Sequence, residues 1–186
     1  MKHAWNPGAV PAFLFHQGTN YRSYELLGCH VNAVAAIFRV WAPNAESVSV
    51  VGDWNDWEIG RDRLTMVSEG GLWETAVEGV ERGHKYKFAI TSKSGDTRLK
   101  ADPFAFQSET DGKTASIVYD IEGYRWNDGA WQASRESINI YDSPMNIYEL
   151  HCGSWRWSAE RNPLSYRETA DQLVPYLAEM GYNYLE

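Results

Sequence analysis

The sequence predicts a mainly β protein: an immunoglobulin-like antiparallel β-sandwich, followed by the opening strand, helix and strand of a parallel α/β fold. Two observations predict this. Short apolar runs separated by turn signals fill residues 33–120, as is typical of a sandwich. After Pro144, an apolar run, a helical pattern and a second apolar run follow one another. We therefore expect an arm at 1–32, a sandwich at 33–120, a linker at 121–143 and a strand–helix–strand unit at 144–186.

Within the predicted sandwich, the alternation of side chains assigns the two faces of the strands. Ala35–Ala42 alternates apolar residues with Arg39, and Lys85–Ile90 alternates apolar residues with lysines. A period of two places one set of side chains in the core and the other on the opposite face. The residues predicted to face inward are Phe38, Val40, Tyr86, Phe88 and Ile90. Residues 52–57 (GDWNDW) read as a turn, and 94–96 as a second turn that joins Lys85–Ile90 to Thr97–Lys100.

The segments on either side of the sandwich have different patterns. The arm mixes Gly, Pro and aromatic residues without a period, so we expect it to pack on another element. Met145–His151 is predicted to be a buried strand and Ser165–Met180 a helix, with Ser165 and Glu168 forming a capping box. Such a unit cannot bury its sheet alone, which indicates that the chain is a fragment of a longer protein.

Composition excludes several classes of function. The chain has 186 residues, and 44% of them are hydrophobic, which disfavours disorder. Its formal net charge of -8 disfavours nucleic-acid partners and anionic membrane surfaces. No apolar run approaches the roughly 18 residues that a membrane helix needs. The 2 cysteines argue against a disulfide scaffold and suit a cytoplasmic protein. The 9 Trp and 11 Tyr suit a large core and also neutral ligands with apolar faces, such as sugars.

The candidate reactive residues favour structural roles. The pairs Cys29-His30 and His151-Cys152 cannot chelate, because adjacent strand residues point to opposite faces; we expect no metal and no cofactor. Glu149, on the predicted strand, lacks a second carboxyl group in its pattern. Asp53 and Asp102 sit in turn-like contexts and are expected to cap backbone amides.

Several motifs carry a resemblance to a known family. They are Phe15–Thr19 (FHQGT), Tyr24–Gly28 (YELLG), Phe38–Ala45 (FRVWAPNA), Val50–Trp57 (VVGDWNDW), Lys100–Ala105 (KADPFA) and Ile147–Trp155 (IYELHCGSW). Together they resemble the N-terminal region of bacterial glycogen branching enzymes (1,4-α-glucan branching enzymes), over nearly the whole chain. The alternatives are a stand-alone α-glucan-binding module, or the N-terminal part of another α-amylase-family enzyme, debranching or trehalose-forming.

The resemblance implies a glycogen-binding-like sandwich followed by the start of a catalytic (β/α)₈ barrel. The family's catalytic carboxylates lie beyond this chain, so no catalytic residue is expected here and the chain alone should be inactive. Trp57 and Lys87 match positions that bind substrate in related modules. Asp96–Arg98 stands where those modules have a second Trp, and Ser116 where they have an Asn. The implied partners are α-glucan and the rest of the barrel, in the cytoplasm; Trp41 and Trp73 are expected to pack in the core or between domains.

Overall fold

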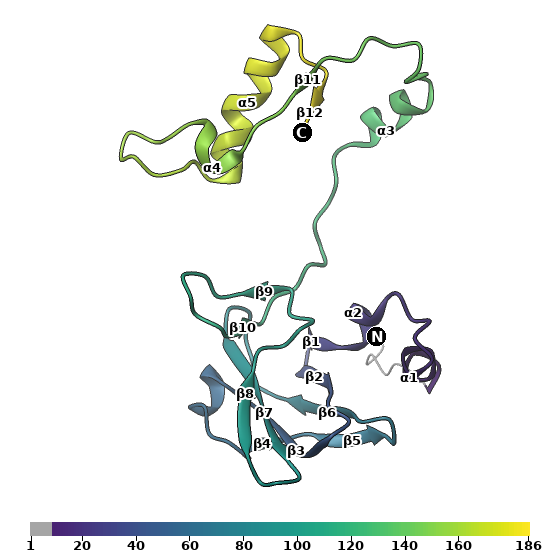
Figure 1. Ribbon diagram of the computed structural model, residues 1–186, viewed down its shortest axis with the longest axis vertical. Helices are drawn as coiled ribbons and strands as arrows, with labels where there is room; N and C mark the ends of the chain where they lie inside the picture. Colours follow the sequence, from purple (N-terminus) through teal and green to yellow (C-terminus); the bar gives the residue numbers. More distant parts are fainter. Residues whose placement is uncertain (1–8) are drawn as a thin grey trace. The chain divides into compact units, whose positions relative to one another are not determined.

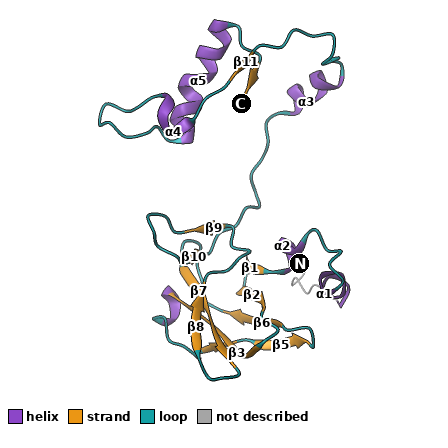
Figure 2. Cartoon of the chain, viewed as in Figure 1, coloured by secondary structure: helices purple, strands orange, loops and turns teal. Residues whose placement is uncertain are grey.

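The computed structural model describes residues 9–186 as two compact units, one ending at Tyr124 and the other comprising Arg125–Glu186. Figure 1 traces both units along the sequence, and Figure 2 shows that strands dominate the first and helices the second. None of the helices among the described residues is both long and apolar enough to cross a membrane.

The first unit contains two antiparallel sheets. Sheet A has the order β1-β2-β6-β5, made of Gly28–Val31, Ala36–Trp41, Leu72–Val77 and Thr65–Ser68. Sheet B has the order β4-β3-β7-β10-β9, with β8 also paired to β7; its strands are Asp62–Arg63, Ala45–Gly52, Lys85–Ser92, Ser116–Ile117, Gln107–Ser108 and, for β8, Thr97–Lys100. The predicted antiparallel β architecture is therefore confirmed, as is the hairpin of β7 and β8.

The core lies between the sheets and contains the side chains that the alternation assigned to it. Phe38, Tyr86 and Phe88 are fully buried, and their rings meet edge to face at centroid distances of 5.1, 6.5 and 6.0 Å. Val40 is buried beside them, and Ile90 packs on the cluster while partly exposed. The predicted inward face is thus confirmed, because burial of apolar area fixes the register of a strand with one core face.

The arm covers the outer face of sheet A, the face turned away from the core. Helices α1 (Ala9–His16) and α2 (Ser23–Leu26) contribute to a second apolar cluster, built from Leu26, Leu27 and Leu72. Beneath it, Arg39 is buried, pairs with Glu74 and donates to the Leu26 carbonyl oxygen at 2.7 Å. Desolvation lowers the pKa of the Arg39 guanidinium to about 10. The expected packing of the arm is confirmed from Ala9 to Leu27, whereas residues 1–8 of its predicted range lie outside the described residues and residues 28–31 form strand β1.

The second unit is a strand–helix–strand arrangement with two additional helices. Strands β11 (Ile147–Tyr148) and β12 (Tyr184–Leu185) pair in parallel, on either side of α5 (Tyr166–Met180). The predicted capping box is present, since the Ser165 hydroxyl accepts from the Glu168 amide and the Glu168 carboxylate from the Ser165 amide. Helices α3 (Gly129–Glu136), inside the predicted linker, and α4 (Cys152–Trp155) complete the unit.

One prediction for this unit is wrong. The segment Met145–His151 was expected to be a buried strand, but only two of its residues are in β11, and Ile147 is 49% exposed. The physical reason is that the parallel sheet has only two strands within this unit, so the apolar strand has few neighbours to cover it.

Candidate functional site

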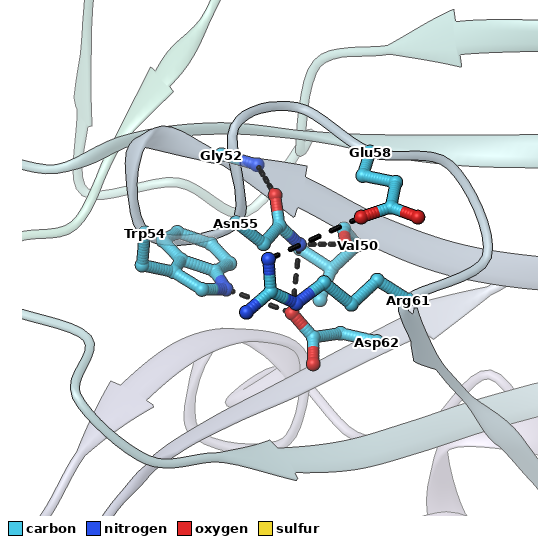
Figure 3. Close-up of polar contacts among 7 residues, drawn as sticks. All are labelled: Val50, Gly52, Trp54, Asn55, Glu58, Arg61 and Asp62. Atoms are coloured by element: carbon cyan, nitrogen blue, oxygen red, sulfur yellow. Dashed lines mark hydrogen bonds and ion pairs between the residues drawn. The ribbon is translucent and has the colours of Figure 1, made fainter.

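A tightly bonded loop follows β3 in sheet B (Figure 3). It contains the short 3-10 helix η1 (Asp53–Asn55), and its central side chain, Asn55, is fully buried. Asn55 Oδ1 accepts from the Gly52 amide at 2.9 Å, while Nδ2 donates to the Val50 carbonyl oxygen at 3.1 Å and to Asp62 Oδ2 at 2.7 Å. The same carboxylate oxygen accepts from Trp54 Nε1 at 2.9 Å. These bonds tie the loop to β3 and β4.

The sequence requirements of this loop follow from close contacts. A Cβ atom at Gly52 would lie 2.4 Å from the Trp54 ring and 2.5 Å from the Lys85 carbonyl oxygen, so no other residue fits without displacement. The backbone then turns through two left-handed residues, Asp56 at φ 52° and Trp57 at φ 60°. Non-glycine residues adopt this region only where the surroundings enforce it. The loop therefore fixes the backbone from which the Trp57 ring projects.

Asp53 connects the Trp57 side chain to sheet B. Its Oδ1 accepts from Trp57 Nε1 at 3.1 Å, and its Oδ2 accepts from the Lys85 amide at 2.8 Å. The indole is thereby held by one edge, while the residue as a whole is half-buried. The expectation that Asp53 caps a backbone amide is confirmed, and the additional bond to Trp57 was not predicted.

Lys87 lies on the outer face of sheet B, two residues from Lys85 on β7. Alternation assigns Lys85 and Lys87 to this face, because Tyr86 and Phe88 point into the core. Lys87 Nζ donates to Thr114 Oγ1 at 2.6 Å, and Lys85 Nζ pairs with Glu109 Oε1 at 3.1 Å. A backbone bond from Ala115, with Lys85 beside it, lowers the pKa of the Glu109 carboxyl group.

The loop and Lys87 belong to the same side of the sheet. Val51, the partner of Lys87 in the β3–β7 register, also points outward, yet it is fully buried. The Gly60 amide donates to Ser49 Oγ, which lies on this outer face too. The loop therefore folds over the outer face of β3, next to the strand that carries Lys87. Sequence reasoning missed Thr114, whose contact with Lys87 spans 27 residues.

Two positions differ from the binding residues of related modules, Ser116 and Asp96–Arg98, and at both the side chains bond within the sandwich. Ser116 is buried, and its Oγ accepts from the Asp102 amide at 2.8 Å. Asp102 in turn accepts from the Tyr86 hydroxyl at 2.6 Å and from the Phe104 amide at 2.9 Å, which confirms its predicted capping role. In the strand where the second Trp is missing, Thr97 bonds to Thr91 on β7. Ser116 therefore supports the core and is not presented to solvent.

The remaining candidates are dispersed. Among residues 9–186, no group of three or more His, Cys, Asp or Glu side chains is arranged to hold a metal ion. Cys29 is buried, and the adjacent His30 ring bonds the Leu27 carbonyl oxygen at 3.0 Å. Glu149 is exposed directly after β11. Trp73 is in the core as predicted, whereas Trp41 is 52% exposed.

The fold and the loop define a class of protein, and the comparison with protein families agrees with it. Residues 26–105 match the family Carbohydrate-binding module 48 (Isoamylase N-terminal domain). This range covers most of both sheets and the η1 loop. The β-sandwich of the first unit is thus similar to a carbohydrate-binding module.

Two curated enzymes are similar to this chain over nearly its whole length. The chain is 47% identical over 187 residues to the 1,4-alpha-glucan branching enzyme GlgB of Bacillus caldolyticus, covering 98% of this chain and 28% of that enzyme. It is 44% identical over 184 residues to the enzyme of the same name from Halothermothrix orenii, covering 97% and 29%. Over nearly its whole length the chain is therefore similar to 1,4-alpha-glucan branching enzymes, and it spans less than a third of the length of these relatives.

A solved structure agrees at the level of the fold. The putative alpha amylase from Salmonella typhimurium superposes with a TM-score of 0.56 at 25% sequence identity, covering 86% of this chain and 24% of that one. The resemblance inferred from the sequence motifs is confirmed by these relatives.

Proposed function

We propose that this chain is the N-terminal part of a cytoplasmic 1,4-α-glucan branching enzyme. Such an enzyme cleaves an α-1,4 bond of a glucan and re-forms it as an α-1,6 branch in glycogen. The observation that carries the proposal is the identity of 47% with a branching enzyme over 98% of the chain. In this proposal, the predicted arm (1–32) precedes and enters the sandwich at β1, residues 33–120 complete the glucan-binding sandwich, 121–143 form a linker, and 144–186 are the first strand, helix and second strand of the catalytic barrel.

The sandwich would bind α-glucan through Trp57 and Lys87. The flat face of an indole stacks on the apolar face of a glucose ring, and an ammonium group donates to its hydroxyl groups. The support for this assignment is the rigid mounting of Trp57 by Asp53 and the position of Lys87 on the same side of sheet B. Thr114, bonded to Lys87, would share in orienting the sugar.

The chain by itself would not catalyse the transfer. A retaining glycosyl transfer needs two carboxyl groups about 5–5.5 Å apart, one as nucleophile and one as general acid. Such groups sit at the carboxyl ends of the strands in a closed barrel, of which this chain would supply two strands. The rest of the barrel is therefore the second proposed partner, and the absence of branch formation by the isolated chain is an expected outcome.

Titration with maltoheptaose tests glucan binding; it is followed by the indole NMR signal of Trp57 and, in every variant, by the backbone amide signals of β7. One stacked ring and a few oriented donors are worth about 3–4 kcal/mol, which corresponds to a Kd in the millimolar range. Trp57→Ala and Lys87→Ala should each weaken binding at this face. Trp131→Ala is the matched control, because Trp131 is an exposed indole on α3 in the second unit. Binding that persists unchanged in Trp57→Ala would refute the assigned site.

A further inference from the structure

A second candidate site lies at the opposite end of the sandwich. A groove of about 490 Å³ is lined by residues of the β2–β3 turn and of the β7–β8 hairpin, among them Trp41, Pro43, Asn44, Ile90, Arg98 and Lys100. The turn leads into the first residue of β3, Ala45, whereas the η1 loop follows the last residue, Gly52. A strand of this length spans roughly 25 Å, so the groove and Trp57 are separate sites.

Trp41 provides a fixed aromatic surface at one side of the groove. Its indole Nε1 donates to the Gly70 carbonyl oxygen at 2.8 Å, and the Phe15 ring meets it edge to face at 5.7 Å. These contacts hold the ring, yet Trp41 remains 52% exposed. An indole that is fixed and half exposed loses little conformational freedom when a ligand stacks on it. Trp57 is likewise held by a hydrogen bond, although it is less exposed than Trp41.

Hydrogen-bond donors line the other side of the groove. Arg98 and Lys100 alternate along β8, opposite Ile90 and Phe88 of β7, so both side chains lie on one face of the strand. Both are exposed, and neither forms an ion pair within the described residues 9–186. Asn44 adds an exposed amide from the turn. Cationic residues commonly protect an edge strand from pairing, but that role does not require an exposed indole across the groove.

We propose that this groove binds a second segment of α-glucan, so that the sandwich holds two chains of a branched polymer at once. The inference rests on the proposed function, since it takes its ligand class from the Trp57 face. A fixed aromatic ring in one groove with amide, guanidinium and ammonium donors suits a neutral polyhydroxyl chain. Two weak sites on one module would bind polymeric glucan more tightly than a short oligosaccharide, through effective concentration.

The experiment follows two indole signals separately during a maltoheptaose titration of the 186-residue chain by NMR. The Nε1–H of Trp41 reports on the groove and the Nε1–H of Trp57 on the other face. We expect both signals to shift saturably. In the double variant Arg98→Ala/Lys100→Ala, the affinity at Trp41 should fall about tenfold or more, because charged donors are lost, while the Trp57 response stays unchanged. Lys93→Ala is the control, since it removes one charge from the same hairpin outside the groove.

The outcomes separate this inference from the proposed function. A Trp57 signal that saturates while Trp41 stays unmoved would overturn the groove site and leave the Trp57 face intact. A Trp41 shift that disappears in Trp57→Ala, or that the double variant leaves unchanged, would also overturn it. A shift of Trp41 that persists in Trp57→Ala supports it. If neither indole responds, glucan binding by the sandwich fails as a whole.

Discussion

Removing the Asn55 side chain tests whether the η1 loop depends on one buried amide. In Asn55→Ala, the Gly52 amide and the Val50 carbonyl oxygen lose the bonds from Asn55, and the Asp62 carboxylate loses one donor while it keeps Trp54 Nε1. A neutral hydrogen bond contributes about 1 kcal/mol and one to a charged group about 1.5–3 kcal/mol, so the free energy of unfolding should fall by about 4 kcal/mol. The loss should be this large because Asn55 is fully buried, and water cannot replace the missing partners.

The assay is urea unfolding of the variant and the parent chain, with hydrogen exchange at β3 and β7 amides to assign the transition to the first unit. Glu58→Ala is the matched control in the same loop. Its ion pair with Arg61 is 4.0 Å long, and both side chains are more than half exposed, so it should contribute at most about 1 kcal/mol. The reasoning is refuted if Asn55→Ala costs no more than Glu58→Ala. A secondary expectation is that Asn55→Ala also weakens maltoheptaose binding, because the backbone that presents Trp57 is no longer fixed.

Three further predictions concern the first unit. Phe88→Ala should destabilise it by about 3–5 kcal/mol in urea unfolding, because the ring is fully buried between the sheets; a loss below about 1 kcal/mol would contradict its place in the core. Burial raises the pKa of Asp102 above its ordinary 3.8, so the contribution of protonated Asp102 to stability is fully present below pH 3.8 and is lost as the pH rises through the higher folded-state pKa. The parent chain should therefore lose stability relative to Asp102→Asn over this range. Parallel pH profiles of the two chains would argue against a raised pKa. Arg39→Met should leave Glu74 without its partner and speed hydrogen exchange in α2. Adding Glu74→Gln to this variant should restore part of the protection. Unchanged exchange in Arg39→Met would mean that the arm is held by apolar contacts alone.

The arm decides the burial of Arg39, which the residue pattern of β2 cannot predict. Alternation in β2 correctly separates Phe38 and Val40 from Arg39, since the two sets point to opposite faces. It cannot tell whether the opposite face meets water or another segment. Here that face is covered by the arm, and the guanidinium is buried with partners from α2 and β6.

The candidate site also combines residues that the local sequence identifies with contacts that form between distant segments. The motif GDWNDW and the strand alternation are sufficient to select Trp57 and Lys87 as candidates, because both signals depend on residues close in sequence. The bonds that orient them are distant: Asp53 contacts Lys85, and Lys87 contacts Thr114. The absence of a family Asn at position 116 was visible in the sequence, but the burial of Ser116 was not.

By itself, the sequence determined the antiparallel β pattern, the inward residues of β2 and β7, the capping box of α5 and the family resemblance, because each depends on periodicity, short spacing or contiguous motifs. Only the tertiary structure decided that Arg39 is buried under the arm, that Thr114 meets Lys87, and that Trp41 is half exposed beside an open groove. These features arise where segments far apart in the chain come together. Burial and partnership there depend on which surfaces cover one another, and no local pattern encodes that.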